Sequence, residues 1–164
     1  MPYEPVIVER EEQPYAAIRG RVRTDGFAVL ADRVPELFGW LAARGTEPVG
    51  GPFFRYDLLG AAGECEVEAG IPVAVAPTPE GDVLSGVLLA GRYATVTHFG
   101  HPDGLAEAAS ALLAWAAVEG LEWDMTATQD GERWGARLET YRTDPRVRPD
   151  PREWETELAF RLAG

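Results

Sequence analysis

The chain has 164 residues, of which 46% are hydrophobic and 26% charged, and this composition suits one globular domain with a buried core. Its formal net charge is −12, and its 15 basic residues are all arginines scattered along the chain, so we expect no nucleic-acid partner. No apolar run approaches ~18 residues, so we expect no membrane partner either. The single cysteine, Cys65, excludes an internal disulfide and a cysteine-built zinc site, and a start without a signal-peptide pattern completes the prediction of a cytoplasmic protein.

Two segments are predicted to be helices from the spacing of their apolar residues. In residues 31–44 the apolar side chains recur at i, i+3, i+4 and i+7, which places them on one helical face. Asp32 is the expected N-cap of this helix, and Gly45 is expected to end it. Residues 104–119 repeat the pattern directly after Asp103, which is the second expected N-cap.

The other patterned segments are rich in residues that favour β-strands. The predicted strands are residues 15–22, 53–59, 64–74, 91–99, 135–143 and 154–162. Turn-rich stretches, among them residues 77–82 and 144–151, separate these strands. Glu64, Glu66 and Glu68 alternate with apolar residues, so we expect their carboxylates to face solvent.

The order strand, helix, strand, strand occurs twice, and short sequence matches in the same order indicate a duplication. The matching segments are 15–18 with 93–96, Trp40 with Trp115, 54–56 with 139–141, and 66–68 with 155–157. We therefore predict a single domain over residues 1–164, with half-repeats at about 13–76 and 86–163 and a linker at 77–85. Ligand sites favour the cleft between two such halves.

Three further motifs lie at residues 70–73, 89–100 and 139–145. In this order and spacing they resemble the GyrI-like small-molecule-binding domain, over nearly the whole chain. The resemblance implies an α+β fold of two βαββ repeats with pseudo-two-fold symmetry, in which a curved antiparallel sheet carries the helices outside and forms a central ligand cleft. The same domain is the effector-binding half of several multidrug-sensing transcription regulators. Because no helix-turn-helix fits before Tyr15, we expect the stand-alone form.

The resemblance also implies that an acidic residue in an aromatic groove meets the cation, and it places that role on Glu139. Strand alternation puts Arg137, Glu139 and Tyr141 on one face. The internal repeat makes Phe54 the equivalent of Glu139. A carboxylate among aromatic rings loses hydration, so its pKa rises unless a cation arrives; each ring face adds roughly 0.5–2 kcal/mol of cation binding. The residues alone also fit Glu139 paired with a neighbouring arginine on a wet edge.

Aromatic side chains complete the expected ligand site. The expected ligand-binding residues are Glu139, Tyr141, Tyr56, Phe54, Trp134 and Trp123. Tyr56 and Tyr141 occupy matched positions in the two halves, so both are expected to line the cleft. Trp123 and Trp134 either pack on the core or wall the pocket, because exposing a loop tryptophan is costly. Trp154 is expected to be structural.

No other side chains indicate a metal or a cofactor. His98 and His101 lie three residues apart without a third ligand of the right type, so we expect no metal site. The resemblance places His98 at a strand end of the family and implies a structural hydrogen bond for it. The chain has no glycine-rich phosphate loop before a helix and no nucleophile elbow, so we expect no cofactor.

The favoured function is that of a stand-alone protein binding bulky aromatic, often cationic, small molecules. One alternative, taken from the resemblance, is a hydrolase of cyclopropane-bearing toxic natural products in which Glu139 positions a water. A second alternative is a protein-interaction module of the gyrase-inhibitor type, whose acidic charge imitates nucleic acid; the sequence names no protein partner. Binding is favoured because it needs only a roomy aromatic cleft and one acid.

Overall fold

The computed structural model describes residues 3–23 and 27–164. The strands are β1 (Val6–Arg10), β2 (Gln13–Arg23), β3 (Phe53–Gly60), β4 (Glu64–Pro72), β5 (Val83–Leu88), β6 (Gly91–Phe99), β7 (Met125–Thr128), β8 (Gly131–Trp134), β9 (Arg137–Tyr141) and β10 (Glu155–Arg161). The helices are α1 (Phe27–Ala31), α2 (Val34–Ala43) and α3 (Leu105–Val118), and short 3-10 turns lie at η1 (Pro102–Gly104) and η2 (Pro151–Glu153). Over the part of the chain that is described, no helix is long and apolar enough to cross a membrane.

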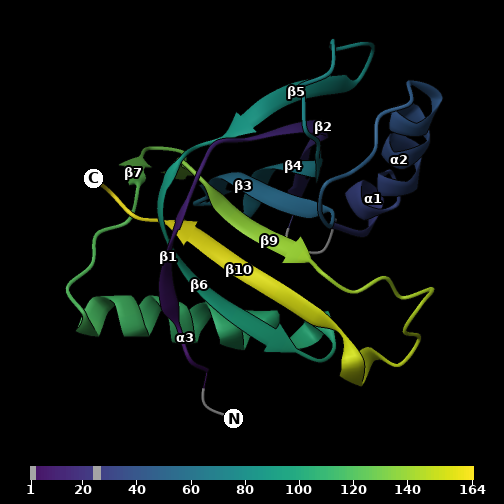
Figure 1. Ribbon diagram of the computed structural model, residues 1–164. Helices are drawn as coiled ribbons and strands as arrows, with labels where there is room; N and C mark the ends of the chain where they lie inside the picture. The colour runs from purple at the N-terminus through teal and green to yellow at the C-terminus, as the bar shows by residue number, and fades with distance from the viewer. Residues whose placement is uncertain (1–2, 24–26) are drawn as a thin grey trace.

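The described strands form one curled antiparallel sheet in the order β1-β6-β10-β9-β3-β4-β2-β5, with the β7–β8 hairpin attached to β3 (Figure 1). Two βαββ units account for its centre. The first is β2-α2-β3-β4 and the second is β6-α3-β9-β10, and they join where β3 pairs with β9. The predicted α+β fold with two βαββ repeats is therefore confirmed.

The strand register is the same in both halves. The equivalent cross-strand pairs are Ala17–Gly70 with Thr95–Ala159, Phe54–Ala69 with Glu139–Leu158, and Pro48–Val73 with Trp123–Leu162. At the junction of the halves, Phe54 lies directly opposite Glu139. These two residues are each other's equivalents in the sequence repeat, so the pseudo-two-fold axis passes through this pair.

Both long helices pack on the outer face of the curled sheet. Leu37 and Leu41 of α2 share a core cluster with Ile18 and Phe54 of the first half. Leu112 of α3 lies in a second cluster, formed with side chains of β6 and β10. Burial of these leucines removes apolar surface from water, which contributes roughly 1.5–3 kcal/mol per side chain.

The inner face of the curl is buried without help from either helix. Tyr15, Phe53 and Tyr93 are at most 3% exposed and form a third cluster with side chains of β9 and β10. Val8 of β1 and Leu88 of β5 pack against this cluster, so both edge strands of the sheet reach it. The sheet therefore has two apolar faces, so the alternation of polar and apolar residues along a strand does not show that one face contacts solvent.

Glu68 lies on this inner face, and the expectation that it faces solvent is wrong. Glu68 is 2% exposed, and its carboxylate accepts a hydrogen bond from the Tyr15 hydroxyl. Arg19 donates to its other oxygen at 2.8 Å, and the Arg55 guanidinium lies 3.8 Å away. Glu64 and Glu66 on the same strand keep 42% and 24% side-chain exposure, so only the beginning of β4 faces solvent as predicted.

The buried carboxylates around Glu68 predict a pH dependence of stability. Burial, followed by the nearby Glu68 carboxylate, raises the pKa of Asp57 to about 6. Because the folded protein holds this proton more tightly than the unfolded chain, stability is highest below the unfolded pKa of roughly 4 and falls as pH rises through about 6. The Asp57 side chain is 22% exposed, so after screening we expect a loss of roughly 1–2 kcal/mol between pH 5 and pH 7.5.

Urea unfolding of Asp57→Asn at both pH values checks this dependence. The variant should lose most of the difference between pH 5 and pH 7.5, whereas Asp103→Asn, at a carboxyl with 92% side-chain exposure, should keep the wild-type difference. An unchanged difference in Asp57→Asn would assign the effect to another group.

Several local predictions about helix ends and strands are wrong. The first long helix begins at Val34, and its N-cap is Arg33 and not Asp32; the Arg33 side chain makes no capping hydrogen bond. Asp103 lies inside η1, where its backbone N–H donates to the ring of His101, and the N-cap of α3 is Gly104. Strands β1, β5, β7 and β8 were not expected, and β5 begins inside the segment predicted as the linker.

Candidate functional site

A buried carboxylate held by two tyrosines lies at the centre of the outer face. Glu139 on β9 accepts hydrogen bonds from the hydroxyls of Tyr56, at 2.9 Å, and Tyr141. Tyr56 comes from β3 and Tyr141 from β9, and the two occupy equivalent places about the pseudo-two-fold axis. The duplication thus supplies one matched pair of donors for a carboxylate that exists in only one half.

Burial and polar contacts act in opposite directions on the pKa of the Glu139 carboxyl. Burial raises the pKa of the Glu139 carboxyl above its ordinary value, while hydrogen bonds from Tyr141 and Tyr56 and the charge of Arg137 oppose part of that rise. Burial and the adjacent Glu139 carboxylate also raise the pKa of both tyrosines, so they stay neutral donors. A positive charge brought close would favour the ionised carboxylate.

The aromatic residues expected at the site divide into two groups. Phe54 packs edge-on against Tyr141, with ring centroids 5.7 Å apart, and joins the cluster under α2. The rings of Trp123 and Trp134 pack together with their centroids 5.6 Å apart. Their centroids lie 5.8 and 5.6 Å from that of Phe160, in the cluster under α3. The tryptophans thus lie on the α3 side of Glu139, and Phe54 and Tyr141 on the α2 side.

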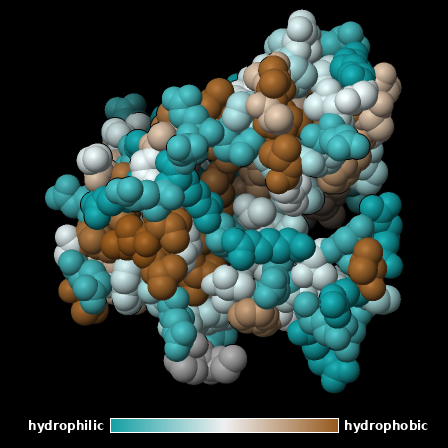
Figure 2. Space-filling model, in the orientation of Figure 1, coloured by the Kyte–Doolittle hydropathy of each residue, from teal (hydrophilic) through white to brown (hydrophobic). Residues whose placement is uncertain are grey.

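A cavity of about 760 Å³ adjoins this centre on the α2 side. It is bounded by α1 and α2, the 50–52 turn, Pro102 and the chain segments 141–146 and 154–156. Figure 2 shows the surface hollowed where α1 and α2 face the 142–154 segment. Small-molecule sites are typically 300–1,000 Å³ and mostly apolar with a few polar groups, so the size suits a drug-sized ligand.

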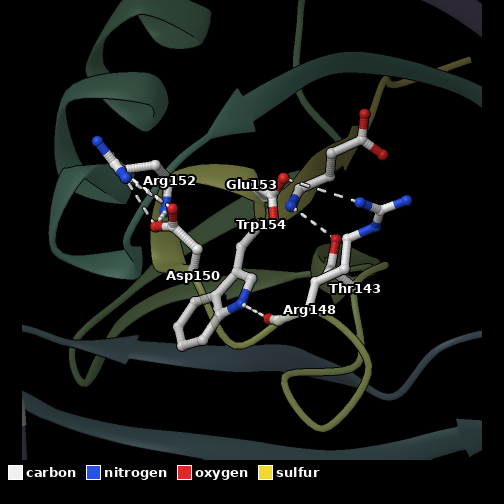
Figure 3. Close-up of polar contacts among 7 residues, drawn as sticks. Thr143, Arg148, Asp150, Arg152, Glu153 and Trp154 are labelled. Atoms are coloured by element: carbon white, nitrogen blue, oxygen red, sulfur yellow. Dashed lines mark hydrogen bonds and ion pairs between the residues drawn. The ribbon is translucent and has the colours of Figure 1, made fainter.

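The 142–154 segment forms one wall of this cavity and is held by its own polar contacts (Figure 3). In residues 144–146 and again in 150–152, an Asp-Pro-Arg sequence folds so that the aspartate accepts from the arginine's backbone N–H and guanidinium. Trp154 Nε1 donates to the carbonyl of Arg148 at 2.7 Å, while the residue also lines the cavity. Trp154 therefore combines the expected structural contact with a place at the cavity.

The structure brings only part of the expected site together. Glu139, Tyr56 and Tyr141 form one hydrogen-bonded group, and Tyr141 alone of the six expected residues lines the 760 Å³ cavity. Sequence reasoning missed Phe38 and Trp154, which contribute ring surface to the cavity. Phe38 belongs to the apolar stripe of α2 but is 36% exposed, and only tertiary contacts could show that it faces a cavity.

His98 has the structural role that was expected. Its Nδ1 is 3.0 Å from the Tyr3 hydroxyl, and its Nε2 is 2.9 Å from the carbonyl of His101. It connects the N-terminal segment to the turn before α3.

Comparison with known proteins settles the family. The model of the GyrI-like small molecule binding domain matches residues 3–163. The chain belongs to the GyrI-like family. Small-molecule binding is the function for which this domain is described.

Several solved structures share the GyrI-like fold. The EcmrR C-terminal domain has a TM-score of 0.77 and 22% identity, over 99% of this chain and 99% of its own. EcmrR in a DNA complex has a TM-score of 0.78 and 21% identity, covering 98% of this chain, which spans 57% of the EcmrR chain. SAV2435 bound to tetraphenylphosphonium has a TM-score of 0.66 and 9% identity, over 100% of this chain and 95% of that one. No curated protein sequence matches the chain.

Proposed function

We propose that this GyrI-like chain binds bulky aromatic cations in the cavity beside Tyr141, with Glu139 as the charge that attracts them. The observation that carries the proposal is the double contact of Tyr141: its hydroxyl bonds the Glu139 carboxylate and its side chain lines the cavity. A ligand packed on the Tyr141 ring thereby lies one side chain away from a buried carboxylate.

The energetics favour a flat, delocalised cation over a compact, strongly hydrated one. Ring faces of Phe38, Tyr141 and Trp154 at the cavity each add roughly 0.5–2 kcal/mol to the binding of a cation. A cation near Glu139 also stabilises the ionised form that burial disfavours. The similar fold of SAV2435, whose structure contains tetraphenylphosphonium, supports the choice of that cation as a probe.

Replacing Glu139 by glutamine tests the proposal. Glu139→Gln keeps the size of the side chain but removes its charge, so we expect tetraphenylphosphonium to bind at least tenfold more weakly, a loss of about 1.4 kcal/mol. Triphenylphosphine oxide, which has similar rings and no net charge, should change less than twofold. Calorimetric titration of both compounds measures these affinities.

Glu119→Gln is the matched control, because this exposed glutamate follows α3 and its loss changes the net charge by the same amount. It should leave both affinities within twofold of wild type. Equal weakening of the charged and the neutral compound by Glu139→Gln would contradict an electrostatic role.

The same geometry supports hydrolysis as a second candidate. A carboxylate with a raised pKa can accept a proton from a water, and two tyrosine hydroxyls beside it can hydrogen-bond a substrate. Incubation with a cyclopropane-bearing electrophile followed by mass spectrometry separates the two functions. A product heavier by one water that requires Glu139 indicates catalysis, and recovery of unchanged ligand indicates binding alone.

A further inference from the structure

The guanidinium of Arg137 lies among the aromatic rings on the α3 side of Glu139. Its guanidinium carbon lies 4.2 Å from the ring centroid of Phe160 and 4.8 Å from that of Trp134. Arg137 lies directly opposite Phe160 in the β9–β10 pairing, so the register of the sheet fixes the contact. With Trp123 touching both rings, these residues form an aromatic cage that is already filled.

The filled cage is close to Glu139. Arg137 and Glu139 are two residues apart on one strand, so they face the same side at a spacing of roughly 7 Å. Among the residues described, no carboxylate lies within ion-pair distance of the Arg137 guanidinium, although the negative charges of Glu132 and Glu139 favour its charged form. Burial lowers the pKa of Arg137, because a guanidinium here has lost part of its hydration. Its main stabilising contacts are the two ring faces.

We propose that Arg137 is a built-in competitor of a ligand's positive charge: held over the rings of Trp134 and Phe160, its guanidinium offsets the negative charge of Glu139 and so weakens the binding of a phosphonium, quaternary ammonium or guanidinium in the cavity beside Tyr141. This inference rests on the proposed function and adds a residue that sets ligand specificity. The two rings fix Arg137 next to Glu139 on the same strand, so its positive charge acts on any cation that the carboxylate attracts. Neutral aromatic ligands in the same cavity carry no net charge for Arg137 to oppose.

Removing the competitor should tighten the binding of cations. We expect Arg137→Ala and Arg137→Gln each to bind tetraphenylphosphonium about tenfold more tightly than wild type, while the affinity for triphenylphosphine oxide changes less than twofold. Arg133→Gln is the matched control, because Arg133 lies on the adjoining β8 strand with 50% side-chain exposure and carries the same charge outside the cage. It should change both affinities less than twofold. In a Glu139→Gln background the gain from Arg137→Gln should shrink to threefold or less.

The outcomes separate this inference from the proposed function. If wild type binds the cation in a Glu139-dependent way and neither Arg137 variant binds it more tightly, the competitor is wrong and the proposed function stands. A gain in Arg137→Ala without one in Arg137→Gln, or an equal gain for the neutral compound, would assign the effect to freed volume and overturn the competitor. If neither wild type nor any variant binds the cation, both ideas fail together.

Discussion

Glu68→Gln is expected to lower the free energy of unfolding by roughly 3 kcal/mol, one of the largest effects of a single side-chain replacement in this protein. Three hydrogen-bond donors or cations, Tyr15, Arg19 and Arg55, hold the buried Glu68 carboxylate, which also lies beside the carboxyl of Asp57. Glutamine offers one acceptor oxygen where glutamate offers two, so the hydrogen bond from Tyr15 or the one from Arg19 is lost. A buried donor without an acceptor costs about 1–3 kcal/mol, and weakening a buried ion pair adds to this.

Glu66→Gln on the same strand is the control for this prediction. Its carboxylate keeps 24% exposure and pairs with the exposed arginines Arg21 and Arg133, so we expect a loss below 1 kcal/mol. Chemical denaturation at pH 7 measures both variants. Similar losses for the two glutamates would mean that the inner cluster contributes no more than a surface ion pair.

The duplication is what made most of the fold predictable. Matches such as Trp40 with Trp115 and 54–56 with 139–141 placed two equivalent halves in order, and the structure reproduces that equivalence pair by pair in the strand register. Strands β1 and β5 occupy equivalent edge positions beside β6 and β2, but their sequences do not match, so the repeat did not reveal them. Strands β7 and β8 escaped because each has only four residues. The burial of Glu68 escaped for a different reason: acid–apolar alternation looks the same whether the acids face water or an inner face closed by the curl of the sheet.

The candidate site was predictable where it lies on strands and not where it lies on loops. Alternation and the repeat placed Glu139, Tyr56 and Tyr141 on one face, and the three form one hydrogen-bonded group. The cavity depends on how the 142–154 segment folds back toward α2, which follows from local Asp-Pro-Arg contacts and not from any periodic pattern. The cation over the rings of Trp134 and Phe160 was equally hidden, since the sequence offered Arg137 and Arg142 only as possible ion-pair partners of Glu139.

Leu37→Ala and Leu112→Ala are each expected to lower the free energy of unfolding by roughly 3 kcal/mol. Both leucines are 0% exposed, one under each long helix, and they are equivalents in the duplication. Truncation removes buried methyl groups and leaves a cavity, a change that costs about 2–5 kcal/mol when neighbours cannot collapse. Val118→Ala, at a side chain that is 85% exposed at the end of α3, should change stability by less than about 0.5 kcal/mol.

The comparison of the two leucines also tests whether the halves fold as one unit. Strands β3 and β9 pair across the junction, and the inner cluster takes Tyr15 and Phe53 from one half and Tyr93 and Leu138 from the other. Because separating the halves would expose this cluster, we expect each variant to show a single unfolding transition by both tryptophan fluorescence and far-ultraviolet circular dichroism, with the two probes giving the same midpoint. The double variant should lose the sum of the single losses to within about 0.5 kcal/mol, since the two sites share no contact. If Leu37→Ala unfolded the first half alone, the two probes would give different midpoints and a second transition would appear at the wild-type midpoint. The junction would then be too weak to hold Glu139 between the two halves before a ligand binds.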